Sequence, residues 1–208
     1  MNGIIDHQHR RPICEIETRL TDGRSICLRT IRPSDEARIR QGIADMSDKS
    51  RYLRFFSAFR EPPESIVKSL SAVDGHDHIG WGAILLDGNH FPPIAAAHAI
   101  RLDENSNKGE LAIAVLDEYH GMGVARMLIA AVMIDCIAEG LSCLEMQVMY
   151  ENNAAANLII GLGAERSTGL GPVLHYSLDA QTALERLDRD RQCDGIAQVL
   201  TLLNARSR

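Results

Sequence analysis

The sequence lacks the features that direct a chain to nucleic acid or into a membrane. Basic side chains number 22 against 28 acidic ones, and the formal net charge of −6 encodes no general attraction to nucleic acid or anionic lipid. The longest apolar run, 127–134, is too short to cross a bilayer, and the N-terminus has no apolar segment of the secretory type. We therefore expect a cytoplasmic protein in which local groups hold any anionic ligand.

Paired cysteine motifs are also missing. The cysteines are Cys14, Cys27, Cys136, Cys143 and Cys193, an odd number with no C-x-x-C pair. Most of them sit inside apolar patterns, which favours buried thiols in a reducing compartment. Neither Cys136 nor Cys143 has a paired base visible in the sequence, so neither is predicted to act as an acyl-accepting nucleophile.

Metal-ligand residue types gather in one short stretch, "DGHDHIGW", at residues 74–81. It contains Asp74, His76, Asp77 and His78. No other cluster of matching spacing accompanies it, and the stretch falls at a turn between a helical and a β-pattern. We predict no metal site.

The length suits one domain with one substantial core. Residues 1–12 are polar and aperiodic and are expected to form a flexible tail, with the main domain over 13–178. A charged, helical C-terminal extension over 179–208 carries an apolar stripe. Such a stripe is expected to pack on its own domain, and a partner surface is the alternative.

The order of predicted elements indicates a mixed α/β fold. A hairpin turning at 22–23 precedes helices up to about residue 71, and three antiparallel strands then turn at 87–88 and at 103–109. The third strand, 111–116, is apolar at every position, which predicts a central strand buried on both faces. A helix ending at Gly140 and the strand "CLEMQVM" complete a βαβ unit. A further helix up to Gly163 and the strand "GPVLHYSL" follow.

Two glycines, Gly121 and Gly123, stand where this central strand passes into the helix. They free the backbone N–H groups of the turn and the first helical turn, which form a binding site for a phosphate. A tight turn without a ligand explains the same pattern, and the pattern alone leaves both open. No Lys-Ser or Lys-Thr follows, and the G-x-G-x-x-G spacing is absent, so a P-loop and a Rossmann fingerprint are excluded.

The segment His120–Ala125 resembles the Q/R-x-x-G-x-G/A pyrophosphate loop of the GCN5-related N-acetyltransferases (GNAT), with His120 where Gln or Arg is usual. Around it, "GELAIAVLDEYHGMG" resembles that family's fourth strand and loop. "ENNAAANLIIGLGA" resembles a motif that ends in Gly-Phe, here Gly163-Ala164. The resemblance covers roughly 24–178. The stretches "LRTIRPSD" and "SRYLRFF" are similar to a subgroup that contains bacterial protein lysine acetyltransferases acting on acyl-CoA synthetases.

The resemblance implies an α/β (α+β) GNAT fold, with a central mixed, mostly antiparallel sheet flanked by helices and splayed central strands that bind acetyl-CoA. It implies direct transfer of the acetyl group to a primary amine, with a protein lysine as the favoured acceptor and a small amine second. The implied partners are acetyl-CoA and this amine, and a homodimer is left open. Acidic residues of the 74–78 stretch could border the entrance for the cationic amine.

A lysine amine has a pKa of about 10.4, so at neutral pH it must lose a proton before it attacks a thioester. The resemblance implies that Glu110, at the start of the central strand, is this base. The alternative is that Glu110 is a charged residue at a strand end that faces solvent. Asn152 matches an asparagine that contacts pantetheine, and a helix N-cap is its alternative role. The cofactor-binding residues implied are Val115, His120, Gly121, Met122, Gly123, Val124, Ala125, Arg126 and Asn152.

One departure from the family pattern concerns the acid that protonates the leaving thiolate. The usual tyrosine position holds Ile159, although a thiol pKa near 8.5 lets the thiolate leave unprotonated. Tyr119 and Tyr150 lie nearby in sequence and are expected to be packing residues with surface hydroxyls. A CoA-binding regulatory module without catalysis is therefore one rival hypothesis. An interaction protein that uses the C-terminal stripe is another.

Overall fold

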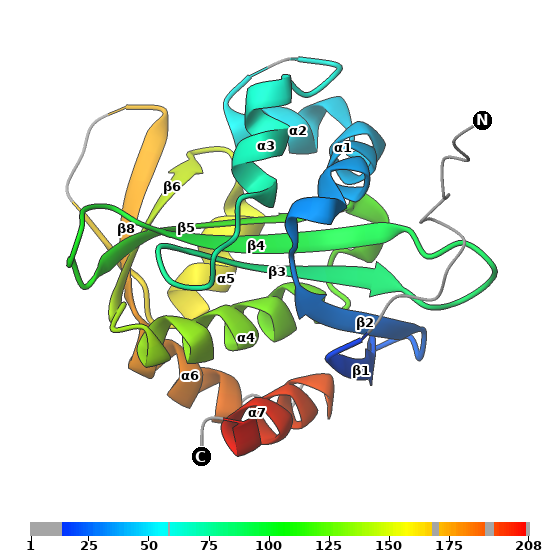
Figure 1. Cartoon of the computed structure of the whole chain (residues 1–208). Coiled ribbons are helices and arrows are strands. Elements are labelled where there is room, and N and C mark those ends of the chain that lie inside the picture. Colours follow the sequence, from blue (N-terminus) through cyan, green and yellow to red (C-terminus); the bar gives the residue numbers. More distant parts are fainter. Residues whose placement is uncertain (1–13, 58, 168–170, 190–193, 207–208) are drawn as a thin grey trace.

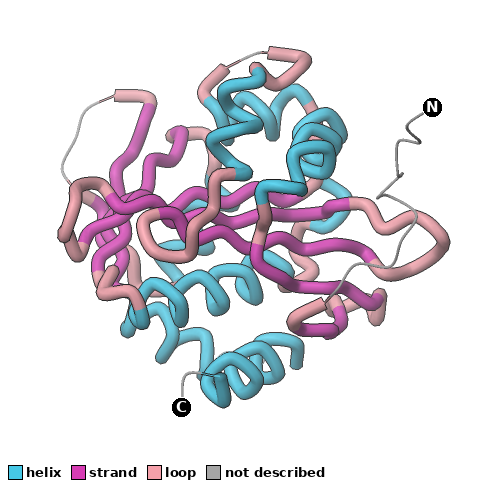
Figure 2. Tube along the Cα trace, viewed as in Figure 1, coloured by secondary structure: helices cyan, strands magenta, loops and turns pink. Residues whose placement is uncertain are grey.

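An eight-stranded sheet organises the described part of the chain. Figures 1 and 2 show the computed structural model. The structure describes residues 14–57, 59–167, 171–189 and 194–206, so the predicted tail over 1–12 lies outside the described residues. The strand order is β1-β2-β3-β4-β5-β6-β8-β7, with every neighbouring pair antiparallel except β5 and β6. The strands are β1 (Ile16–Arg19), β2 (Ser25–Thr30), β3 (His78–Leu85), β4 (Pro93–Arg101), β5 (Lys108–Val115), β6 (Cys143–Met149), β7 (Glu165–Arg166) and β8 (Val173–Asp179).

Helices cover both faces of this sheet. Figure 1 shows α1, α2 and α3 above it and α4, α6 and α7 below it, and α5 connects β6 to β7. Two short 3-10 turns, η2 and η3, precede α1 and follow β5. The bounds are η2 (Pro33–Asp35), α1 (Glu36–Asp45), α2 (Asp48–Phe55), α3 (Glu64–Ser71), η3 (Asp117–Tyr119), α4 (Val124–Ala138), α5 (Asn153–Gly161), α6 (Ala180–Arg189) and α7 (Asp194–Arg206).

Helix α4 is apolar around most of its circumference because it lies between two layers. It contacts β3 and β4 on one side and α6 and α7 on the other, so it has no solvent-facing stripe to fill with polar residues. Its Asp135 accepts a hydrogen bond from the indole of the buried Trp81 at 2.7 Å. The apolar stripe of α7 is buried against α4 and β1, and its members are Ile196, Val199, Leu200 and Leu203.

Strand β5 is central, as the sequence predicts, but the expectation that both of its faces are buried is wrong. Of residues 111–116, only Leu111 is buried and the others are half-buried. The parallel ladder with β6 ends after Glu110 pairs with Glu145, and the remainder of β5 has no partner on that side. The two strands therefore diverge, and the apolar side chains that follow line an opening between them.

The state of the cysteines also differs from the prediction of buried thiols. Cys14 and Cys27 form a disulfide that joins the chain before β1 to β2, which the apolar sequence pattern did not predict. Cys136 is a buried thiol, and burial raises its pKa to about 12, so it is not a nucleophile at neutral pH. Cys143 is half-buried, and Cys193 lies outside the described residues. Across the described parts of the chain, no helix is both long and apolar enough to span a membrane.

Candidate active site

A groove of about 480 Å³ opens where β5 and β6 diverge. Its walls come from both strands, from α2, from the loop and first turn of α4, and from α5. These elements are far apart in the sequence, and the divergence of two neighbouring strands in the middle of the sheet brings them together. The groove contains most of the residues that the sequence pattern selected.

The glycine loop forms one end of the groove. Gly121 and Gly123 have positive φ angles of 75° and 85°, a conformation that glycine adopts without strain. Gly123 is the N-cap of α4, and no side chain caps the helix there. A Cβ on Gly121 would meet nothing within 4 Å, so the loop is open to an incoming group. An uncapped helix start that faces a groove is the arrangement that binds phosphate.

Five of the six residues at 120–125 line the groove, as does Arg126. Met122 does not, because its side chain points to the other side of the loop. Its sulfur lies 3.1 Å from a guanidinium nitrogen of Arg24. Any contact of Met122 with a cofactor would therefore involve its backbone.

His120 interacts directly with the end of β5. Its Nε2 lies 3.0 Å from the Val115 carbonyl oxygen, so the Nε2–H tautomer donates a hydrogen bond to it. The imidazole thus links the loop to the strand. Because the Val115 carbonyl takes part in this bond, its backbone N–H is the main group that Val115 can offer to a cofactor.

Asn152 lines the groove and is also a helix cap. Its Oδ1 accepts a hydrogen bond from the backbone N–H of Ala155 at 3.2 Å, at the start of α5. The two roles proposed from sequence are compatible, because capping uses the side-chain oxygen and leaves the amide nitrogen as a donor.

Glu110 lies at the opposite end of the groove from the glycine loop. It is exposed, and it is the last residue of β5 that pairs with β6. The Arg54 guanidinium, carried by α2, also lines the groove, and its side chain is half-buried. Burial lowers the pKa of Arg54 to about 10, and the charge of Glu110 opposes this shift. A carboxylate and a guanidinium therefore share this end of the groove.

Sequence reasoning did not select Arg54 as a site residue. The stretch "SRYLRFF" contained the signal, but its resemblance indicates a subgroup of the family and assigns no role to any single residue. Three other residues of this stretch also line the groove: Ser50, Leu53 and Phe56. The hydroxyl of Ser50 donates to the carboxylate of Asp117, just beyond β5. This bond holds the start of α2 against the end of the strand.

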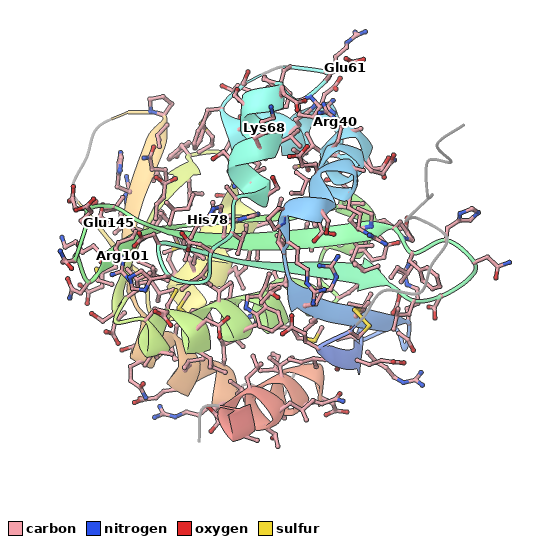
Figure 3. All side chains as sticks on the ribbon, viewed as in Figure 1. Arg40, Glu61, Lys68, His78, Arg101 and Glu145 are labelled. Carbon is pink, nitrogen blue, oxygen red and sulfur yellow. A yellow bond between two sulfur atoms is a disulfide. The ribbon has the colours of Figure 1, made fainter. Side chains whose placement is uncertain are left out.

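Behind Arg54, two histidines form a buried pair. Nε2 of His78 and Nδ1 of His98 are 2.9 Å apart, and His78 lies where α3 meets the sheet (Figure 3). Burial, and secondarily the charge of Arg54, lower the pKa of His98 well below its usual value, so this ring is neutral.

An acid for the leaving group is absent at the expected position. Ile159 is buried and lines the groove with an apolar side chain. Tyr150 is exposed and outside the lining, whereas Tyr119 is buried and lines the groove. Burial raises the pKa of Tyr119, and the Arg24 guanidinium lies 4.6 Å from its ring centroid. The prediction that both tyrosines place their hydroxyl groups at the surface therefore agrees better with the exposed Tyr150 than with the buried Tyr119.

The 74–78 stretch forms a turn away from the groove. Asp74 accepts hydrogen bonds from the backbone N–H groups of His76, Asp77 and His78, and none of the four lines the groove. Within the described ranges, no group of three or more His, Cys, Asp or Glu side chains could hold a metal ion.

The match to a family model agrees with this geometry. The model of the acetyltransferase (GNAT) family matches residues 40–163. The chain therefore belongs to this family of acyl-CoA-dependent N-acyltransferases, whose acyl donor is acetyl-CoA. The predicted fold class is confirmed.

Among individual proteins, the chain is similar to acetyltransferase Pat of Mycolicibacterium smegmatis. The identity is 30% over 152 residues, which cover 73% of this chain and 45% of Pat, so the chain matches less than half the length of that relative. The GNAT domain of S. lividans PAT matches with a TM-score of 0.71 at 23% identity, over 79% of this chain and 96% of that domain. The yncA structure from Salmonella typhimurium, which holds its cofactor acetyl-CoA, matches with a TM-score of 0.58 at 13% identity, over 74% and 94% of the two chains.

Proposed function

We propose that this chain moves an acetyl group from acetyl-CoA directly to a primary amine, with a protein lysine as the favoured acceptor. The observation that carries the proposal is the groove between β5 and β6, with an uncapped helix start at one end and the exposed carboxylate of Glu110 at the other. In this proposal the N–H groups at residues 121–125 hold the phosphates of CoA, with Arg126 beside them. The N–H of Val115 and the amide of Asn152 hold the pantetheine arm.

Glu110 removes a proton from the acceptor ammonium, directly or through a water. The amine nitrogen then bonds to the thioester carbonyl carbon, the C–S bond breaks, CoA leaves as a thiolate, and the new amide nitrogen releases its remaining extra proton to solvent. Near neutral pH a thiol pKa of about 8.5 makes that departure feasible without an acid, which is consistent with Ile159 in the groove. Arg54 assists, because a cation beside the reacting position favours the neutral form of an arriving amine.

A protein lysine is favoured because two stretches resemble lysine acetyltransferases, and one of them, "SRYLRFF", lines the groove. Arg29 and Asp35, from "LRTIRPSD", form a buried ion pair that fixes the start of α1, and "SRYLRFF" supplies Arg54. Glu110 is exposed, so a side chain presented by another protein can approach it.

The test is an acetylation assay with acetyl-CoA and two acceptors, an acyl-CoA synthetase with its reactive lysine and a small primary amine. Release of free CoA and a mass gain of one acetyl group on the lysine are the expected results. Glu110→Gln should abolish most of this activity, while Glu145→Gln, its exposed register partner on β6, should retain it. If Glu110→Gln turns over at the parent rate across the pH range, Glu110 is not the base.

The rival function is a CoA-binding module without catalysis, which Ile159 favours because it leaves the groove without a hydroxyl at that position. Saturable binding of acetyl-CoA without CoA release, for either acceptor, would support the module. Turnover with one CoA released per acetylated amine would exclude it.

A further inference from the structure

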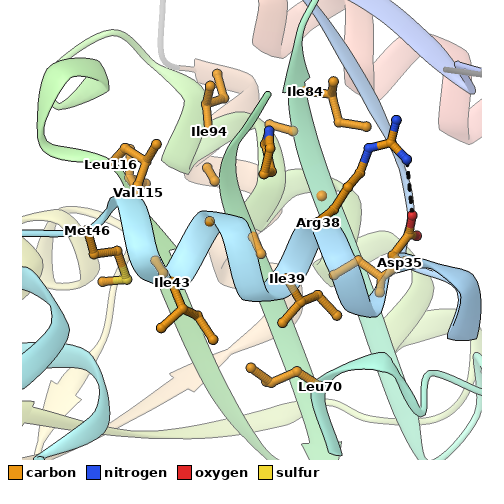
Figure 4. Close-up of a pocket in the computed structure, with 18 of the residues that line it drawn as sticks. Asp35, Arg38, Ile39, Ile43, Met46, Leu70, Ile84, Ile94, Val115 and Leu116 are labelled. Atoms are coloured by element: carbon orange, nitrogen blue, oxygen red, sulfur yellow. Dashed lines mark ion pairs between the residues drawn. The ribbon is translucent and has the colours of Figure 1, made fainter. Parts of the chain in front are cut away.

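A second cavity, of about 90 Å³, lies between α1 and the upper face of the sheet (Figure 4). Its accessible lining is almost entirely apolar. Figure 4 shows Ile39, Ile43, Leu70, Ile84 and Ile94 around it. A water needs roughly 10–15 Å³ of such space, so the cavity has room for several atoms, and its walls offer them few polar partners.

This cavity adjoins the groove. Four residues line both spaces: Met46, Arg54, Ala114 and Val115. Ala114 is small and lies on β5 beside Val115, in the part of the strand that has no partner on the β6 side. A group that extends past these shared residues would pass from the groove to the apolar space beneath α1.

Gly42 helps to keep the cavity open. It lies inside α1, where glycine is less favourable than alanine. Backbone packing does not require it, because a Cβ at this position would lie 3.5 Å from its nearest neighbour, a side-chain atom of Pro93. The effect of the glycine is that no side chain projects into the cavity from this turn of the helix.

The charges around the cavity decide which reactant it suits. Arg54 lies where the cavity adjoins the groove, and Arg29, Arg38 and the carboxylate of Asp35 line the other end of the cavity. A cationic lysine side chain that enters from the groove would meet the positive charge of Arg54. An uncharged alkyl chain meets no such penalty and gains from burial.

We propose that this cavity accepts the acyl chain of donors longer than acetyl-CoA, such as propionyl-CoA and butyryl-CoA. The inference rests on the proposed acyl transfer and extends it to the length of the acyl group. Each methylene buried in an apolar space strengthens binding about fourfold. Butyryl-CoA, with two more methylenes than acetyl-CoA, is then expected to bind roughly 16-fold more tightly.

The test compares calorimetric Kd values, and kcat/KM with one amine acceptor, for acetyl-, propionyl- and butyryl-CoA. Gly42→Leu should fill the cavity and remove the advantage of butyryl-CoA, and Gly42→Ala should reduce it about fourfold, by the space of one methyl group. The matched control is Gly161→Leu, at the exposed end of α5, where a Cβ meets nothing within 4 Å; it should keep the parent ratio. Circular dichroism and the Tm of each variant establish whether that variant is folded. If Gly42→Leu does not fold, the comparison of Gly42→Ala with the parent decides the test.

Equal Kd values for acetyl- and butyryl-CoA in the parent would overturn the inference. So would an advantage of butyryl-CoA that persists in both Gly42 variants. If the parent binds and uses acetyl-CoA but gains nothing from longer chains, only the inference fails. If the parent neither binds nor uses any of the three donors, the proposed function fails with it.

Discussion

Replacement of Asp35 by asparagine tests whether the "LRTIRPSD" stretch holds the fold together. The Asp35 carboxylate accepts hydrogen bonds from two nitrogens of Arg29, at 2.7 and 2.6 Å, and from the backbone N–H of Arg32 at 2.9 Å. Both members of the ion pair are buried. The asparagine side chain would keep one acceptor oxygen, but its NH₂ group would face a donor, and the guanidinium would lose its counter-charge. Removal of one partner from a buried pair costs about 3–5 kcal/mol.

The assay is urea unfolding of the parent, Asp35→Asn and Glu64→Gln at several pH values. Glu64 pairs with Arg40 across two half-exposed side chains, so its loss should cost no more than about 1 kcal/mol. Burial acts to raise the pKa of Asp35, but the hydrogen bonds and charge of Arg29 outweigh it, and the net pKa lies below the usual value. The stabilisation is therefore complete above about pH 4 and is lost as the pH falls through the lowered pKa.

The cost of Asp35→Asn should accordingly shrink on acidification. A cost at pH 7 no larger than that of Glu64→Gln would refute the reasoning. A cost that grows as the pH falls would refute it as well, because protonation of Asp35 in the parent should bring the two proteins closer together.

Three further predictions concern the site and the N-terminal strands. Glu110→Gln should lower kcat by about 10²–10⁴-fold and flatten its rise with pH, measured by CoA release, whereas a parent-like pH profile would exclude the base. Gly123→Glu should abolish calorimetric binding of acetyl-CoA. Gly88→Glu has the same type of backbone strain at a φ of 91° and should retain binding, so loss in both variants would point to misfolding. Cys27→Ser opens a disulfide across 13 residues and should lower the free energy of unfolding by about 3 kcal/mol. Added reductant should produce a comparable loss in the parent and none in the variant; parent stability that ignores reductant would contradict this.

Part of the site could be predicted from sequence because its signals are local. Gly121 and Gly123 occupy the positive-φ positions that the pattern required, at the start of an uncapped helix. The βαβ order also predicted the parallel pairing of β5 and β6. The roles assigned to Glu110, Asn152 and the loop remain predictions, to be decided by the variants above.

Other features depended on contacts that no local pattern encodes. Arg54 reaches the groove because α2 packs against β5, and Met122 is turned away from it by Arg24. The β1–β2 register pairs Cys27 with Glu17, so the disulfide forms because the chain before β1 brings Cys14 to within 5.3 Å of Cys27, measured between the Cα atoms. Spacing in the sequence carries no information on these distances.

The sequence by itself determined the elements, their order and the glycine turn, because periodicity and backbone conformation act over a few residues. The tertiary structure decided where β5 separates from β6. From its sequence alone, the apolar strand β5 is predicted to be fully buried. In the structure its later residues line a groove, because the pairing of β5 with β6 stops at Glu110. Strand divergence and the packing of α1 over the sheet are set by long-range contacts, and these contacts create both the groove and the cavity beside it.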